Sequence, residues 1–197
     1  SHDVELVNLV LKIKNQPFYI NQISKDGSVL NVAAANNDLL IVKSLLSIPG
    51  INPDYLNKDQ YTPLMLAIKN LNYEMIDEFL NFYGNNIQSQ VSRISNALRD
   101  IIIKMNNKNS DDLLKIIKKF RTIPNIDLNF YNEGKTILIN SCINNNIELV
   151  KILLDSYQID TNLYDLTNGN TPLIIACKNK NKELAKLLIE HPQTNIN

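Results

Sequence analysis

The sequence predicts an all-α fold, a solenoid of stacked helix–turn–helix units joined by β-hairpin-like turns. Three observations support this prediction. A seven-residue block that opens a short helix occurs four times, beginning at Ser28, Thr62, Thr136 and Thr171. An aliphatic ridge typical of a second helix follows each copy, and a closing block rich in Asn and Asp ends most units. The starts lie 34, 74 and 35 residues apart, which is about one, two and one periods of a two-helix repeat.

The first helix of each unit is best defined at residues 171–177, Thr-Pro-Leu-Ile-Ile-Ala-Cys. Pro172 suits the first turn of a helix, where its missing N–H breaks no hydrogen bond and its φ is already helical. Thr171, just before it, can cap the free N–H groups. The block recurs closely at 62–68, and in looser form at 28–34 and 136–142.

The second helix of each unit is predicted from the aliphatic ridge, whose copies are 41–46, 75–80, 149–154 and 184–189. A unit of this kind is apolar on faces that it cannot cover alone, so it needs a neighbour of the same kind. The closing blocks are 51–54, 126–129, 159–162 and 194–197.

The gap of 74 residues has room for one more unit, which must lie in divergent form between residues 85 and 129. Apolar residues at helical spacing predict an amphipathic helix over 91–105. Residues 106–109 break it, and Ser110-Asp111-Asp112 then begins a second helix with an acidic first turn. The segment is either one divergent repeat with longer helices or a break between two short stacks.

Residues 1–21 fit half a unit, in which Asp3 caps one helix and the first helix is absent. We expect a single repeat domain over 1–197. Its parts are the half repeat 1–21 and the repeats 22–54, 55–90, 91–129, 130–162 and 163–197. The incomplete first unit and the closing block at the last residues indicate either a fragment of a longer protein or unusual end caps.

These blocks resemble ankyrin repeats. Thr-Pro-Leu, at 62–64 and 171–173, is the most specific tripeptide of that family. Gly134 and Gly169 match the glycine of its hairpin turn, two residues before the threonine. The second helices at 42–46 and 150–154 match its Val-x-x-Leu-Leu pattern. The resemblance covers nearly all of the chain.

Two departures from the family pattern carry expectations. The histidine that usually follows Thr-Pro-Leu is replaced by Asn31, Met65, Ile139 and Ile174. In the family that histidine makes hydrogen bonds between repeats, so we expect more apolar packing there. The glycine that usually ends the first helix is missing, and asparagines crowd that region instead: Asn37, Asn70, Asn72, Asn145, Asn179 and Asn181. Asn tolerates the left-handed conformation that a helix C-terminus requires.

Composition restricts the class of function. Lys+Arg and Asp+Glu are both 20, and this balance argues against nucleic-acid and membrane-surface binding, which need clustered positive charge. No apolar run is long enough to span a membrane. Cys142 and Cys177 are the only cysteines, which fits a reduced intracellular protein, and we expect a cytoplasmic monomer without cofactors.

Few residues offer chemistry. Cys142 and Cys177 lie at equivalent positions in adjacent repeats, where helices about 8–10 Å apart are too distant for an unstrained disulfide. We therefore expect two buried, reduced core cysteines. His2 and His191 have no Cys or His at ligand spacing, so neither a metal site nor a catalytic triad is expected. Asp111-Asp112 is interpreted as a helix start rather than a carboxylate pair. A run of cations is either a basic patch for an acidic partner or, as we favour, a solvated helix face: Lys115, Lys118, Lys119 and Arg121.

The resemblance implies a protein–protein interaction scaffold without catalysis, whose partner binds the concave face made by hairpin tips and inner helices. The hairpin candidates are Lys25, Lys58, Asp59, Tyr61, Asn132, Glu133, Lys135, Thr167, Asn168 and Asn170. The candidates at the ends of the first helices are Asn36, Lys69, Asn70, Asn144, Lys178 and Asn179. Tyr61 is the one aromatic residue among them; it is either an anchor for the partner or a packing residue against the next hairpin.

Two further hypotheses stay open. The repeats could be the targeting or substrate-recognition arm of a larger protein, with an enzyme or effector domain outside residues 1–197. A closing asparagine could also be hydroxylated, and Asn162 most resembles the family's sites for this modification.

Overall fold

The computed structural model describes residues 20–104 and 111–196. Most of the half repeat at 1–21, and the predicted break at 106–109, therefore lie outside the described residues. The chain divides into two compact units, Ser1–Ala97 (unit 1) and Leu98–Asn197 (unit 2), with the boundary inside one helix. Each unit is described by itself.

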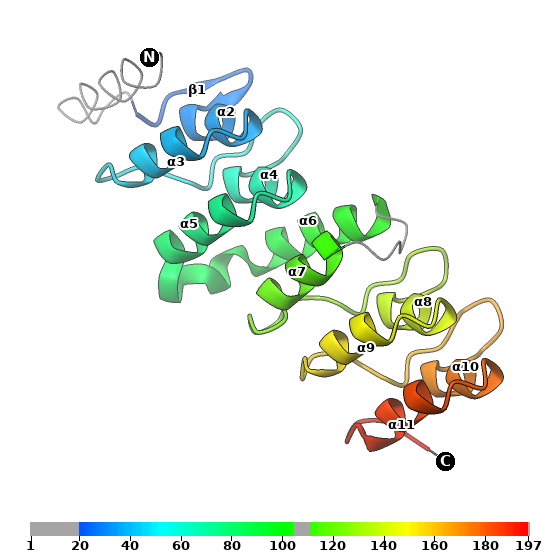
Figure 1. Cartoon of the computed structure of the whole chain (residues 1–197). Coiled ribbons are helices and arrows are strands. Elements are labelled where there is room, and N and C mark those ends of the chain that lie inside the picture. Colours follow the sequence, from blue (N-terminus) through cyan, green and yellow to red (C-terminus); the bar gives the residue numbers. More distant parts are fainter. Residues whose placement is uncertain (1–19, 105–110, 197) are drawn as a thin grey trace. The chain divides into compact units, whose positions relative to one another are not determined.

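Unit 1 contains one strand pair and two helix pairs that lie side by side (Figure 1, blue to green). The antiparallel strands β1 (Ile23–Ser24) and β2 (Gly27–Ser28) pair Ile23 with Ser28. Two pairs follow: α2 (Val29–Ala35) with α3 (Leu39–Leu46), and α4 (Pro63–Lys69) with α5 (Tyr73–Tyr83). A 3₁₀ helix, η2 (Gly84–Gln90), then leads into α6 (Val91–Lys104). The predicted helix over 91–105 is confirmed as far as Lys104.

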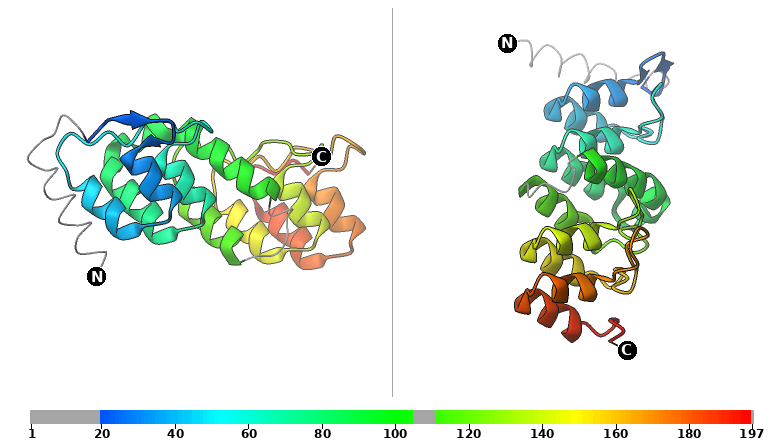
Figure 2. Two further views of the ribbon diagram at one scale, coloured as in Figure 1. Left: turned by 90° about the horizontal axis from the view of Figure 1, so that it is seen from above. Right: turned by 90° about the vertical axis from the view of Figure 1, so that its right-hand side faces the viewer.

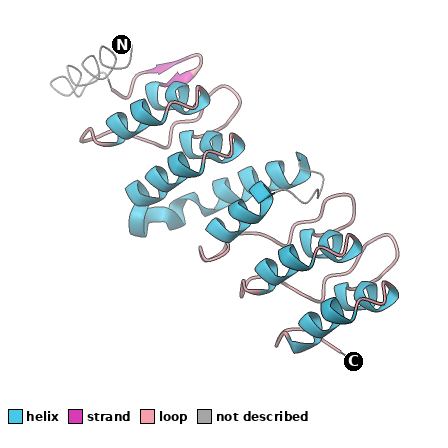
Figure 3. Ribbon diagram, viewed as in Figure 1, coloured by secondary structure: helices cyan, strands magenta, loops and turns pink. Residues whose placement is uncertain are grey.

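Unit 2 begins in the second part of α6 and continues with α7 (Asp111–Phe120). Two helix pairs follow: α8 (Ile137–Ile143) with α9 (Ile147–Leu154), and α10 (Pro172–Lys178) with α11 (Lys182–Glu190). Both further views show α8 and α10 side by side (Figure 2, yellow and orange). The acidic first turn of α7 and its C-terminal lysines are as the sequence predicts. Figure 3 shows that helices and loops make up nearly all of the described chain.

The first helices begin where the sequence predicts, because each is capped by a hydroxyl side chain. Ser28, Thr62, Thr136 and Thr171 adopt extended backbone angles, and each accepts a hydrogen bond from the N–H three residues on. Pro63 and Pro172 occupy the first helical position. These caps satisfy N–H groups that the helix itself leaves without an acceptor.

The core of each unit lies between its helix pairs. In unit 1 the fully buried side chains include Leu30, Leu45, Leu64 and Phe79. In unit 2 they include Leu138, Ile139, Leu153, Ala176 and Leu184. Each large aliphatic side chain removed from water contributes about 1.5–3 kcal/mol, and most of this burial requires the neighbouring pair.

The turn between the two helices of a pair places one residue at positive φ. Asparagine fills that position in two repeats, at Asn37 (φ 60°) and Asn145 (φ 52°), as expected. In the other two repeats the residue is Leu71 (φ 54°) and Lys180 (φ 56°), so the expectation that asparagine takes this role throughout is wrong. The asparagines beside Leu71 and Lys180 instead end one helix and cap the next.

These asparagines also connect neighbouring helix pairs. The Asn70 amide donates to the carbonyl of Ala34 at 3.2 Å, one repeat earlier, and the Asn72 amide donates to Asn37 Oδ1 at 2.8 Å. Unit 2 repeats the pattern, since the Asn179 amide donates to the Cys142 carbonyl at 3.0 Å and the Asn181 amide to Asn145 Oδ1 at 3.1 Å. The excess of asparagine, about one residue in six, thus has a structural use between repeats.

A second set of asparagines ties each closing block to the next. The Asn129 side chain donates to the Gln158 carbonyl at 2.7 Å and accepts from the Asp160 N–H at 2.9 Å. Asn162 makes the same two bonds, with the Gln193 carbonyl and the Asn195 N–H. In unit 1, Asn21 bonds in this way to Gly50 and Asn52. We call this paired contact the amide clamp.

No amide clamp connects the end of the repeat at 22–54 to the repeat at 55–90, and no projecting loop follows α5. Asp54 occupies the clamp position, and a carboxylate cannot donate as an amide does. It accepts instead from the Tyr83 hydroxyl at 2.6 Å. Burial, together with this hydrogen bond and the nearby Asp54 charge, raises the pKa of Tyr83 well above its usual value, so the hydroxyl stays a donor. α5 runs directly into η2 where the other repeats turn out into a loop.

Replacing Asn129 with Ala is expected to lower the free energy of unfolding by about 2 kcal/mol, because two partly buried hydrogen bonds are lost and their backbone partners stay in place. Urea unfolding measures this. Asn85→Ala, at an exposed position in η2, is the control and is expected to change stability little. Equal stability of the two variants would contradict the clamp.

Replacing Lys180 with Asn is expected to stabilise the protein by about 0.5 kcal/mol, since asparagine tolerates positive φ better than lysine. Lys180 is exposed, so little packing is lost. Lys182→Asn, in the first turn of α11, is the control and is expected to bring no gain. Thermal unfolding compares them; a loss of stability in Lys180→Asn would argue against the conformational reason.

Candidate functional site

The hairpins that project beside the first helices are held by their own polar groups. In unit 1, Asn57 Oδ1 accepts from the N–H groups of Asp59 and Tyr61 at 3.0 and 2.9 Å. Gln60 takes positive φ at the tip. Side chains on the outside of this loop are therefore presented on a backbone that is already ordered.

The two hairpins of unit 2 are ordered in a similar way. Asn132 and Lys135 form an antiparallel bridge around Glu133 and Gly134, which both have positive φ. In the next hairpin, buried Asp165 accepts from the Thr167 hydroxyl and N–H at 2.6 and 2.9 Å and lies 3.9 Å from the Lys135 ammonium. The hydrogen bonds from Thr167, helped by Lys135 and opposed by desolvation, lower the pKa of Asp165.

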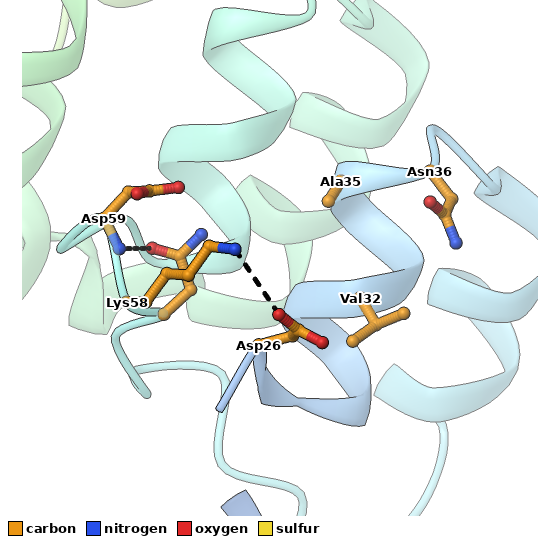
Figure 4. Close-up of a pocket in the computed structure, with 7 residues that line it drawn as sticks. Asp26, Val32, Ala35, Asn36, Lys58 and Asp59 are labelled. Carbon is orange, nitrogen blue, oxygen red and sulfur yellow. Dashed lines mark hydrogen bonds and ion pairs between the residues drawn. The ribbon is translucent and has the colours of Figure 1, made fainter. Parts of the chain in front are cut away.

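The structure brings several predicted site residues of unit 1 together. Asn36, Lys58 and Asp59 line one pocket of about 290 Å³, which Asp26 also borders (Figure 4). The Lys69 ammonium lies 4.6 Å from the centre of the Tyr61 ring. Tyr61 is half-buried, so part of its ring is exposed to solvent while the ring also contacts the Lys69 ammonium.

Three other predicted residues are two asparagines at the ends of first helices and one lysine in a turn. Asn70 is partly committed to structure by its bond to Ala34, and Asn179 by its bond to Cys142. Lys25 is exposed in the turn between β1 and β2. These asparagines thus belong to the framework as much as to a surface for a partner.

In unit 2 the remaining predicted residues gather around the two hairpins. Thr167 and Asn168 bond to Asp165, and the Lys178 ammonium donates to Asn170 Oδ1 at 2.7 Å. Glu133 and Asn144 are exposed. The predicted residues therefore form two sets, one on each unit.

Sequence reasoning missed one exposed apolar side chain on each hairpin. Ile23, Leu56, Tyr131 and Tyr164 all lie two residues after the clamp position, and they are 57%, 39%, 36% and 51% exposed. Leu166, two residues after Tyr164, is also exposed, and the Tyr131 hydroxyl donates to the Tyr164 carbonyl at 3.2 Å. We call the four the hairpin column because they share one position in the repeat; Ile23 and Leu56 belong to unit 1, and Tyr131 and Tyr164 to unit 2. The sequence contains a signal for these residues, because each lies two positions after the Asn or Asp that ends a closing block.

Asn31 corrects the expectation of apolar packing in place of the family histidine. Its side chain is buried, accepts from Ser28, and donates to the carbonyls of Tyr55 and Tyr61 at 3.0 and 3.1 Å. In the first full repeat a carboxamide therefore still bonds to the next hairpin. At Met65 and Ile139 the buried replacements are apolar, as expected.

The two cysteines differ. Cys142, on α8, is buried, whereas Cys177, on α10, is exposed. The prediction of two buried cysteines is therefore wrong for Cys177. Helix α10 packs on α8 and covers Cys142, while no described element covers the same position on α10 itself. Burial raises the pKa of the Cys142 thiol to about 12.

Other candidate chemistry finds little support in the described ranges. Within residues 20–104 and 111–196 no group of three or more His, Cys, Asp or Glu side chains could hold a metal ion. No helix of the described part is long and apolar enough to cross a membrane. In the basic run, Lys115 and Lys118 are exposed, whereas the Arg121 side chain is 24% exposed and forms an ion pair with Asp155 at 3.4 Å.

Stacked helix pairs with ordered, projecting hairpins are the architecture of a helical repeat protein. A family model for three copies of the ankyrin repeat matches residues 1–93 and 101–197. The chain belongs to the ankyrin-repeat family. Ankyrin repeats are generally protein–protein interaction modules, and the all-α fold expected from the sequence is confirmed.

Two solved structures have the same fold. The ankyrin repeat protein EF0377 has 21% identity and a TM-score of 0.56, with 96% of each chain covered. An ankyrin repeat domain from Acinetobacter baumannii has 22% identity and a TM-score of 0.60, over 95% of this chain and 93% of that one. At these identities the likeness shows the fold.

The curated relative is the NAD-dependent deacetylase sir2B of Dictyostelium discoideum, 25% identical over 163 residues. The match covers 79% of this chain and 20% of that protein. The chain thus spans about a fifth of the length of the relative it matches.

The burial difference between the cysteines predicts selective labelling. At pH 8 iodoacetamide is expected to modify Cys177 and leave Cys142 unmodified, because the Cys142 thiol is covered and protonated. In denaturant both should react. Peptide mass spectrometry measures the two sites, and the Cys177→Ser variant isolates the slow one. Comparable native rates at both cysteines would contradict the packing of α8 against α10.

Proposed function

We propose that this chain is a protein-binding module whose partner contacts the hairpins and the adjoining ends of the first helices. The contact set combines the residues predicted from sequence with the hairpin column. The module has no catalytic role of its own in this proposal; it acts by holding a partner.

The hairpin column carries the proposal. Large apolar side chains scattered singly on a surface need no explanation, but here one recurs at the same position of each hairpin. Their backbones are fixed by Asn57, Asp165 and the bridge at Asn132, so little conformational entropy is lost when a partner binds. Tyrosine is also enriched among residues that dominate binding energy.

Mixed charge surrounds these apolar side chains. Lys25, Lys58 and Asp59 are exposed near the column in unit 1, and Glu133 lies beside Tyr131 in unit 2. Such a rim favours specificity and the rate of encounter more than affinity. A polar, moderately salt-sensitive interface is the consequence.

The double variant Tyr131→Ser with Tyr164→Ser is expected to lose at least about tenfold in affinity for peptides selected from a displayed library on the intact chain. Biolayer interferometry with two or three enriched peptides measures this. Tyr157→Ser is the matched control, because Tyr157 is 62% exposed but lies after α9, outside the hairpins. Retained binding by the double variant, or a library that yields no binders, would reject the hairpin face of unit 2.

A second candidate function is that of a targeting arm within a larger protein. The partial match to sir2B, which covers about a fifth of that protein, motivates it. In that case the hairpins select the protein on which an adjoining domain acts. Sequencing the complete transcript decides the matter: an adjoining catalytic domain supports the arm, and repeats alone on both sides reject it.

A further inference from the structure

The pocket of unit 1 lies between the second hairpin and the first helix pair. It is lined by Asp26 from the β1–β2 turn, by Val32 and Ala35 of α2, by Asn36 at the C-cap of α2, and by Asn57, Lys58 and Asp59 of the next hairpin. Figure 4 shows Lys58 and Asp59 on one side and Val32, Ala35 and Asn36 on the other, with the Lys58 ammonium pointing toward Asp26. Its volume of about 290 Å³ is at the lower limit for small-molecule sites, so it suits one side chain rather than a whole cofactor.

The floor of the pocket is apolar although it faces solvent. Val32 is 39% exposed, and Ala35 beside it is exposed as well. Both belong to α2, where residues three apart lie on one face of the helix. An aliphatic stem laid along Val32 and Ala35 would remove this surface from water.

The charges at the opening favour a cation. Two carboxylates, Asp26 and Asp59, and one ammonium, Lys58, border the pocket. Lys58 lies 3.6 Å from Asp26, in a pair whose side chains are 65% and 51% exposed. The Asp59 carboxylate has no hydrogen bond or ion pair with another described residue, since only its N–H is engaged, by Asn57. One negative charge is thus left without a counter-ion.

We propose that this pocket takes an arginine side chain of the bound partner. The stem lies on Val32 and Ala35, and the guanidinium meets Asp59 and the carbonyl oxygen of the Asn36 amide, with Asp26 within reach. Arginine fits better than lysine because its planar group offers five donors and can satisfy several acceptors at once. This inference rests on the proposed function, since it names what the partner presents to unit 1.

Lys58 is expected to oppose binding of the arginine side chain. Its ammonium repels an incoming guanidinium and occupies Asp26. The exposed pair contributes little to stability, so removing it does not threaten the fold. Loss of the lysine should therefore strengthen binding, while loss of the Asp59 charge should weaken it.

The test is an NMR titration of the ¹⁵N-labelled intact chain with Nα-acetyl-arginine amide. Saturable shifts are expected at the amides of Val32, Asn36 and Asp59, and no such shifts with the neutral analogue Nα-acetyl-citrulline amide. Asp59→Asn should weaken binding roughly three- to fivefold, and Lys58→Gln should tighten it by a similar factor. Glu74→Gln, which removes an exposed acid at the start of α5, should leave it unchanged.

Equal shifts with citrulline, or weaker binding in Lys58→Gln, would overturn the proposal. The spectrum of each variant also reports whether it is folded, so a loss of binding cannot be confused with unfolding. The tyrosine double variant separates this inference from the proposed function, because its substitutions are in unit 2. If the chain binds peptides from the library but not Nα-acetyl-arginine amide, only the pocket proposal is rejected. If it binds Nα-acetyl-arginine amide but no peptide from the library, only the hairpin column is rejected.

Discussion

A carboxamide that both donates to a carbonyl and accepts from an N–H one repeat away is the interaction on which this structure depends. Asn129 and Asn162 make it in unit 2, and Asn21 makes it in unit 1. A loop without regular secondary structure would otherwise leave these backbone groups to water. The clamp fixes each closing block on the next, and this in turn sets the position of the hairpin that follows.

Function follows from that framework. Three hairpins begin directly after a clamped asparagine, Asn21, Asn129 or Asn162, and the hairpin at 55–61 begins after Asp54. The exposed side chain two positions later therefore occurs at the same point of each hairpin. Apolar burial between helix pairs supplies the stability. The regular presentation stops after α5, where η2 takes the place of a projecting loop.

The sequence predicted the helices well because their signals are local. Thr62-Pro63 and Thr171-Pro172 define a cap and a first turn without help from distant residues, and the ridges of the second helices follow from period alone. Positive φ at Leu71 and Lys180 could not be predicted, because each residue stands between two asparagines, which tolerate that conformation better. The exposure of Cys177 likewise depends on what stacks beside α10.

The candidate site was predicted less completely than the fold. Position in the repeat put Lys58, Asp59 and Asn36 among the predicted partner-binding residues, and the structure adds that these three share a pocket with Asp26. Asp26 pairs with Lys58 across two hairpins that are far apart in sequence, and no local pattern encodes that distance. The hairpin column was not predicted because nearly all the hairpin candidates named from the sequence were polar residues.

Amide hydrogen exchange at Asp160 tests the central claim most directly. This N–H lies in a loop, and the Asn129 side chain is its acceptor. The account predicts exchange slowed by at least about tenfold in the wild-type chain, and exchange near the unprotected rate in Asn129→Ala while the amides of α8 and α10 stay protected. An Asp160 amide that exchanges freely in the wild-type chain, or one that Asn129→Ala leaves unchanged, would contradict it.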